Sequence, residues 1–169
     1  LNAACLVSVA KETGQTATTF VYKNALKMWS RMYGPSRAGA RWYINQDVEP
    51  QLNDMDKVVG TGGIPVYLPA GGLSQAPFST LFGRPVIPIE QCSTLGTVGD
   101  VILADFTRYV TINKGGVQEA SSMHVNFTTD EMAYRFTLRL DGQPIAQSAL
   151  TPANGTNTLS SFVVTATRA

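Results

Sequence analysis

Apolar and polar side chains alternate along two consecutive stretches of this sequence, residues 122–129 and 133–141. In the second stretch the even-numbered positions are apolar, whereas Arg135 and Arg139 stand among the odd-numbered ones. A period of two is typical of a strand with one buried face. A strand from 133 to 141 would span about 30 Å, which is long for a small domain. We therefore expect this strand at a surface or at a contact with another molecule, with 122–129 as its partner.

Further apolar runs predict shorter strands. They cover residues 41–45, 81–89 (interrupted by prolines), 100–105, 109–113 and 161–167. We expect 100–105 and 109–113 to be buried, and 109–113 to end at a Gly115-Gly116 turn. The Asp141-Gly142 pair is expected to end the long strand.

Helices are predicted only in the first third of the chain. An amphipathic pattern predicts a helix that ends near Met32, with Thr16 or Thr18 as its N-cap. Asp47 is a candidate cap for a short helix that ends near Met55. The expected fold class is α+β, because two helices are followed by a long loop and then by an antiparallel β-rich part.

Residues 58–80 are rich in glycine and proline and carry few charges. Only residues 64–68 have a strand-like sequence there, and Pro65 would confine them to the edge of a sheet. Loops of this length inside a compact domain are usually functional or poorly ordered. We therefore interpret this segment as an extended surface loop.

The composition excludes several classes of protein. Of the 169 residues 44% are hydrophobic, so the chain is not disordered, and no stretch approaches the ~18 apolar residues of a membrane span. A net charge of +1 gives no bulk attraction to nucleic acid or membranes. Only 15% of residues are charged, and weakly charged chains are poorly protected against association. These features favour a subunit of an assembly.

The chain begins at Leu1 without an initiator Met or a signal peptide, so we expect it to be part of a longer protein. Its two cysteines, Cys5 and Cys92, lie far apart in the sequence. Spacing does not decide whether they pair. Because nothing indicates secretion, buried reduced thiols are the favoured interpretation.

Candidate catalytic and metal-binding residues are few. His124 is the one histidine and lies within a predicted strand, without a nucleophile elbow elsewhere in the sequence. Glu49, Asp54 and Asp56 cluster around the short helix, which is compatible with a cation site or a glycosidase-type carboxylate pair. Carboxylates in the first turn of a helix are ordinary. We expect no catalytic residue, no metal site and no cofactor.

The basic and aromatic residues between 29 and 43 are a candidate nucleic-acid interface. Arg31, Arg37 and Arg41 lie near Trp29 and Trp42 in the sequence. Stacking combined with phosphate contacts requires such a mixture, but core packing of the rings explains most of it. The arginines could equally meet the carboxylates or carbonyls of a neighbouring subunit.

Several phrases, in this order and spacing, resemble the C-terminal portion of the major capsid protein of tailed bacteriophages. They are residues 2–5 (NAAC), 28–33 (MWSRMY), 42–52 (WYINQDVEPQL), 81–88 (LFGRPVIP), 99–105 (GDVILAD), 114–117 (KGGV) and 136–144 (FTLRLDGQP). The fold of that family is shared with encapsulin shells and the herpesvirus capsid floor. The resemblance covers nearly the whole chain.

The resemblance implies an axial domain and part of a peripheral domain. Residues 1–115 would be mainly axial, and 116–169 would supply mainly peripheral-domain strands and a C-terminal tail. The N-terminal arm, extended hairpin loop and spine helix of the family would precede Leu1. The implied function is a non-enzymatic structural subunit of an icosahedral phage or prophage capsid, located in the virion and in the host cytoplasm during assembly.

The implied partners are copies of the same chain, in pentamers and hexamers, with a scaffold or a maturation protease left open. No membrane and no sequence-specific nucleic acid is expected. The expected subunit contacts lie on the long strand and in the loop at 69–79, at Arg135, Arg139, Pro69, Gly71, Gly72 and Phe78. An encapsulin-like cargo shell is an alternative. From another class, a small hydrolase or ligand-binding domain would use His124 and the acidic cluster near Asp54.

Overall fold

The computed structural model describes residues 4–59, 62–65, 67–68 and 79–169. The chain divides into two compact units, here called the core unit (1–108 with 146–169) and the ribbon unit (109–145). This division differs from the boundary expected at residue 115, because the last strand of the chain belongs to the sheet of the core unit. The strand predicted at 161–167 is thus confirmed, but it packs with the N-terminal half of the sequence.

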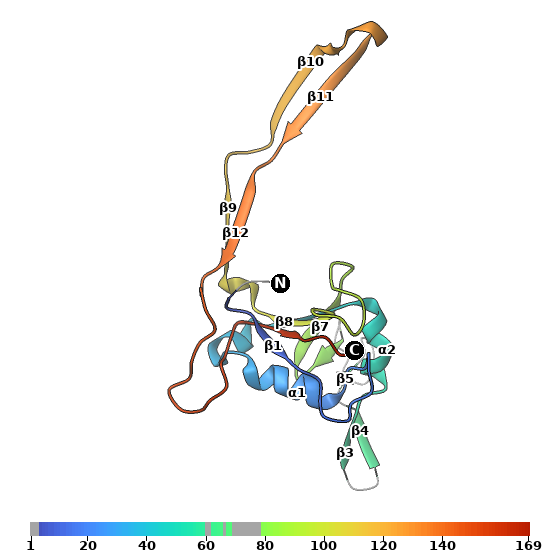
Figure 1. The fold of residues 1–169 in the computed structure, drawn as a ribbon, viewed down its shortest axis with the longest axis vertical. Helices are drawn as coiled ribbons and strands as arrows, with labels where there is room; N and C mark the ends of the chain where they lie inside the picture. Colours follow the sequence, from blue (N-terminus) through green and yellow to red (C-terminus); the bar gives the residue numbers. More distant parts are fainter. Residues whose placement is uncertain (1–3, 60–61, 66, 69–78) are drawn as a thin grey trace. The chain divides into compact units, whose positions relative to one another are not determined.

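The core unit contains a seven-stranded mixed sheet (Figure 1). In spatial order its strands are β1 (Val7–Val9), β13 (Phe162–Thr165), β8 (Val101–Ala104), β2 (Arg41–Ile44), β7 (Arg84–Pro88), β6 (Thr80–Leu81) and β5 (Tyr67–Leu68). The pairs β1–β13 and β2–β7 are parallel, and the other neighbours are antiparallel. The central strands β8 and β13 are buried and contain few polar residues. The burial predicted for residues 100–105 is therefore confirmed.

Helix α1 (Tyr22–Arg31) contacts β1 and β13 and buries Ala25 and Met28. It begins later than predicted, and neither threonine caps it. Thr18 adopts a positive φ of 55°, and its N–H donates to the carbonyl of Arg168 at 2.7 Å. The approach of the C-terminal segment therefore fixes a non-helical backbone at this residue. The side chain of Asn24 closes the first turn instead, by accepting from the Val21 N–H at 3.1 Å.

The other helices are short. They are η1 (Gly34–Ala38), η2 (Gln46–Val48), α2 (Glu49–Asn53), η3 (Phe106–Arg108) and η4 (Phe127–Thr129). The predicted cap at Asp47 is wrong, because Asp47 lies inside η2. Asn45 caps η2, since its side-chain oxygen accepts from the Asp47 N–H at 3.0 Å. The N-cap of α2 is Val48, which makes no side-chain cap hydrogen bond.

The segment predicted as one long loop contains strands. β3 (Asp56–Val59) and β4 (Gly62–Pro65) pair antiparallel, and β5 joins the large sheet through β6. The strand predicted at 64–68 is therefore divided between two different sheets. β6 and β7 are joined by Phe82 and Gly83, both with positive φ (50° and 70°), as a two-residue hairpin turn of type I′ requires.

The ribbon unit consists of two successive antiparallel pairs (Figure 1). β9 (Tyr109–Asn113) pairs with β12 (Leu140–Pro144), and β10 (Gln118–Asn126) pairs with β11 (Glu131–Thr137). The strand predicted over 133–141 is therefore broken after Thr137, and each half has its own partner. β12 also continues through the Asp141-Gly142 pair that was expected to end it. All five residues of β9 are exposed, contrary to the prediction, because no layer within this unit covers the strand.

Candidate subunit-contact surfaces

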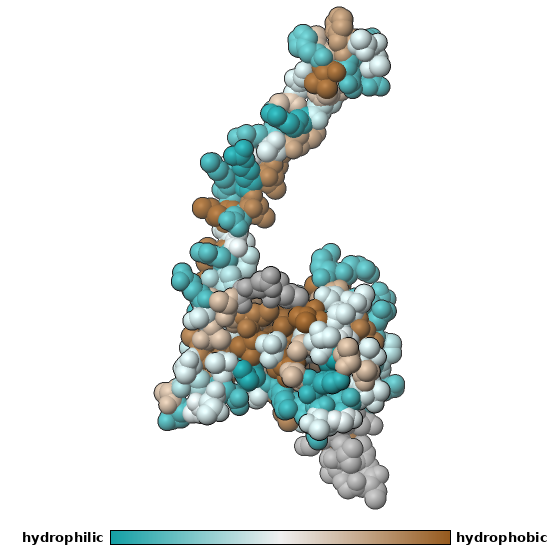
Figure 2. Space-filling model, viewed as in Figure 1, coloured by the Kyte–Doolittle hydropathy of each residue, from teal (hydrophilic) through white to brown (hydrophobic). Residues whose placement is uncertain are grey.

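One face of the β10–β11 ribbon carries large apolar side chains of β11, here called the bare apolar face, beside Glu119 and Ser121 of β10. Tyr134 lies opposite Ser121 and Phe136 lies opposite Glu119, so both rings project from the same face. Tyr134 is 61% exposed and Phe136 is 65% exposed. Figure 2 shows hydrophobic side chains at the surface along this unit. Two-stranded ribbons are only marginally stable in water, so this face requires a covering layer from elsewhere.

Further apolar side chains are exposed where the β9–β12 pair meets the β10–β11 pair. Ile112, Leu138 and Leu140 line a shallow groove with a volume of about 620 Å³. Lys114 and Arg139 stand at its border, and the Lys114 N–H donates to the carbonyl of Arg139 at 3.0 Å. Most large exposed apolar side chains of the described chain belong to the ribbon unit. Contiguous apolar surface of this kind marks interaction sites.

The two predicted contact arginines both lie in the ribbon unit. Arg135 pairs in register with Ala120 and occupies the face opposite the bare rings. Arg139 lies in the link between β11 and β12, and both side chains are exposed. Among the residues that the structure describes, ion pairs join only Lys27 to Glu12 and Arg168 to Asp100. Both guanidinium groups are therefore available to another molecule.

The remaining predicted contact residues lie outside the described residues. They are Pro69, Gly71, Gly72 and Phe78. Their assignment to subunit contacts stays a prediction.

The residues of the hydrolase alternative belong to different units of the chain. His124 is exposed in β10, where its backbone N–H donates to the Ser122 hydroxyl at 3.2 Å, and Asp54 is exposed at the end of α2 in the other unit. Glu49 accepts a hydrogen bond from the Tyr67 hydroxyl at 3.3 Å. Within the described ranges, no three His, Cys, Asp or Glu side chains form a group that could hold a metal ion.

The basic and aromatic residues between 29 and 43 are used mainly inside the core unit. The Arg37 guanidinium stacks over the Trp29 ring at 5.2 Å and donates to its carbonyl at 3.0 Å. Arg31 donates through Nε to the Thr158 carbonyl at 2.6 Å. The Trp42 ring is fully buried, and its N–H donates to a backbone carbonyl at 3.0 Å. The Trp42 ring is therefore closed to bases, and Arg37 already stacks on the Trp29 ring.

A buried polar cluster that the sequence did not predict joins the C-terminal tail to the large sheet. Arg168 donates through Nη2 to the Asp100 carboxylate, and both side chains are fully buried. Asp100 also accepts from the Thr165 hydroxyl at 2.6 Å and from the Gly96 N–H at 2.9 Å. Arg168 donates through Nε to the Thr19 carbonyl at 2.7 Å. No local sequence pattern links residues so far apart along the chain.

Both cysteines are free and buried, as the sequence favoured. Burial raises the pKa of the Cys92 thiol to about 11, with a further contribution from the negative charge of Asp100. Burial also raises the pKa of Cys5 above its ordinary value. Neither thiol is therefore activated as a nucleophile.

Within the described part of the chain, no helix has the length and apolar character needed to cross a membrane.

The fold is similar to that of a solved capsid chain, from the capsid of an empty GTA particle computed with C5 symmetry. The TM-score is 0.61 with 13% sequence identity, over 97% of this chain and 50% of that chain. The α+β fold is thus the phage major-capsid fold, as expected. This chain spans about half the length of that capsid chain.

Residues 2–155 match the model of the phage capsid family. The chain therefore belongs to the phage capsid family, which confirms the resemblance seen in the sequence. A comparison with curated proteins finds no match.

Proposed function

We propose that this chain belongs to a non-enzymatic structural subunit of a phage or prophage capsid, which associates with copies of itself into pentamers and hexamers. The observation that carries the proposal is the bare apolar face of the β10–β11 ribbon. Covering a Phe or Tyr side chain is worth roughly 1.5–3 kcal/mol. Tyr134 and Phe136 would therefore contribute several kcal/mol to a contact that buries both.

The core unit would form the axial part of the subunit and the ribbon unit the peripheral part. Contacts around a ring join different surfaces of neighbouring subunits. A ribbon with an apolar face and a polar face suits this arrangement, because it can contact different neighbours on its two sides. The loop at 69–79 is proposed as a further contact.

Arg135 and Arg139 would supply specificity on the polar side of the ribbon. An arginine fork pairs with a carboxylate through two parallel hydrogen bonds. Such pairs at an interface fix register and select partners more than they add affinity. The structure leaves both side chains exposed without an acidic partner in the described part of the chain.

The test is electron microscopy of the full-length protein after expression, in which closed particles are expected. The variants Arg135→Glu and Arg139→Glu should reduce the yield of particles while circular dichroism shows a folded protein. Lys23→Glu is the matched control, because it reverses an exposed charge on α1 of the core unit. Absence of particles from the unmodified protein would refute the proposed function, whereas normal assembly of both arginine variants would refute only their role.

The associated location is the virion capsid, with the host cytoplasm as the place of assembly. A scaffold or a maturation protease remains a proposed partner. Co-expression with the neighbouring genes of its source, followed by the same microscopy, would test whether either is needed.

A further inference from the structure

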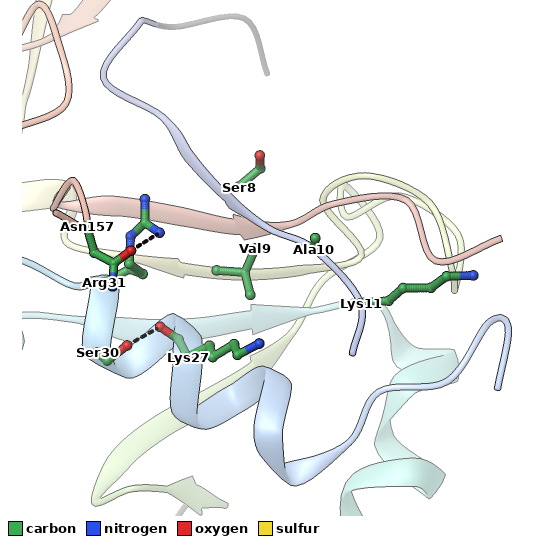
Figure 3. Close-up of a pocket in the computed structure, with 8 residues that line it drawn as sticks. All are labelled: Ser8, Val9, Ala10, Lys11, Lys27, Ser30, Arg31 and Asn157. Carbon is green, nitrogen blue, oxygen red and sulfur yellow. Dashed lines mark hydrogen bonds between the residues drawn. The ribbon is translucent and has the colours of Figure 1, made fainter. Parts of the chain in front are cut away.

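A polar pocket lies between β1 and the C-terminal half of α1 in the core unit (Figure 3). Its volume is about 360 Å³. Ser8 and Lys11 line it from β1 and the residues that follow, Lys27 and Arg31 line it from α1, and Asn157 closes one end. β1 is the edge strand of the described sheet, so no further strand covers this side.

The pocket is cationic. Lys11, Lys27 and Arg31 contribute three positive charges, and none of the residues that line it is acidic. Lys27 Nζ lies 2.6 Å from Glu12 Oε1, and Lys11 Nζ donates to the Ala169 carbonyl at 2.5 Å. Within the described residues Arg31 has no acidic partner, so the lining keeps an excess of positive charge at this residue.

Arg31 is held in place but retains free donors. It donates through Nε and Nη2 to Thr158, at 2.6 and 2.7 Å, and through Nη1 to Asn157 Oδ1 at 3.5 Å. A guanidinium has five N–H donors, so two remain for a ligand. Because these contacts fix the side chain before binding, little conformational entropy is lost when a ligand arrives.

The other donors are also incompletely used. An ammonium has three N–H donors, and Lys27 directs one toward Glu12. The Ser8 hydroxyl points away from α1 (Figure 3). The Ser30 hydroxyl already donates to the Lys27 carbonyl at 2.8 Å. The free donors of the pocket are therefore those of Arg31 and Lys27 on α1.

We propose that this pocket binds a phosphate group. The guanidinium of Arg31 would provide two hydrogen bonds and Lys27 would provide charge, which is the combination that proteins use for phosphate. The phosphate could be inorganic phosphate or one phosphate of a nucleic-acid backbone, since the recognising chemistry is the same. None of the residues proposed above as subunit contacts lines this pocket.

The test is a titration of the full 169-residue chain with inorganic phosphate, at constant ionic strength maintained with sodium chloride. Backbone ¹H–¹⁵N resonances of residues 8–11 and 27–31 should shift together and saturate. Lys27→Gln should weaken binding roughly threefold, the value of one exposed ion pair. Lys23→Gln, which removes the same charge one turn earlier on α1 and does not line the pocket, should bind like the unmodified chain.

A short single-stranded oligonucleotide distinguishes the two sources. If it shifts the same resonances at lower phosphate concentration, the ligand is a nucleic-acid phosphate, and if it does not, the ligand is the free anion. Shifts that do not saturate, or an equal loss of affinity in Lys23→Gln, would overturn the proposal, because either result means general attraction to surface charge.

Discussion

Arg168 and Asp100 form a fully buried ion pair that ties the end of the chain to the residue preceding β8. The carboxylate has three donors around it, from Arg168, Thr165 and Gly96. Each charge in this pair is compensated only while the C-terminal segment lies against the sheet. The pair therefore couples the docking of that segment to the stability of the core unit.

Replacement of Arg168 by Ala should destabilise the core unit strongly. The change leaves the Asp100 carboxylate buried without its counter-charge, which typically costs about 3–5 kcal/mol. Urea denaturation followed by circular dichroism measures the loss in free energy of unfolding. Lys23→Ala, an exposed change on α1, should have an effect within about 0.5 kcal/mol. A loss below 1 kcal/mol in Arg168→Ala would mean that the pair is not closed to solvent.

Phe136→Ser should impair assembly without lowering the stability of the core unit. The ring is 65% exposed in the ribbon unit and makes its proposed contribution only when another surface covers it. Sedimentation velocity gives the assembled fraction, and thermal unfolding of unassembled protein gives the stability. Leu26→Ser, which replaces an exposed apolar side chain on α1 of the core unit, is the control. If both variants assembled equally well, the bare face would have no part in association.

The raised pKa of Cys92 predicts a loss of stability at alkaline pH. In the unfolded chain the thiol ionises near its ordinary pKa of 9.0, whereas in the folded protein it ionises near about 11. Between these values the unfolded state binds fewer protons, so the free energy of unfolding falls as the pH rises, by up to about 2–3 kcal/mol. Below pH 9 the contribution of the Cys92 thiol to the free energy of unfolding is fully present.

The measurement is urea denaturation at pH 8 and pH 10.5, in the unmodified protein and in Cys92→Ala. Subtracting the two series removes the contribution of the lysines and tyrosines that titrate in the same range. The difference in stability between the two proteins should shrink as the pH rises. A difference independent of pH would show that the thiol is accessible to water.

Gly39→Ala should destabilise the core unit through a contact with Asp105. A Cβ at residue 39 would lie 2.8 Å from Asp105 Oδ1. That oxygen cannot move freely, because it accepts from the Thr107 N–H at 3.1 Å and from its hydroxyl at 2.7 Å. We expect a loss of about 1–3 kcal/mol in the free energy of unfolding.

Gly34→Ala is the matched control for that substitution, since a Cβ at Gly34 meets no atom within 4 Å. Chemical denaturation of the two variants side by side checks the comparison. Equal stability would show that the Asp105 side chain can leave its position at no cost.

The alternation of side chains predicted β10 and β11 because these strands have one apolar and one polar face. The same alternation concealed the break after Thr137. Leu138 and Leu140 continue the period of two across the break, and periodicity carries no information on which strand lies alongside. The prediction that β9 is buried is wrong for a related reason. An apolar run indicates a strand whose side chains need burial, but it does not show whether the burying surface belongs to the same chain.

Errors at the helix ends arise from contacts between distant residues. Thr18 is a good cap by residue type, but its backbone bonds to Arg168 near the other end of the chain. The pair of Asp100 and Arg168 is equally invisible to local patterns. The family resemblance, by contrast, rests on phrases in α1 and the buried strands of the core unit, and also on residues 114–117 and 136–144 of the ribbon unit.

In an assembled particle, the bare face of the ribbon unit should be covered by another protein segment. A cryo-electron microscopy map of particles formed by the full-length protein, at side-chain resolution, measures this directly. We predict that Tyr134 and Phe136 lie against another protein segment and are shielded from solvent. A map in which both rings face open solvent in every subunit would contradict the account.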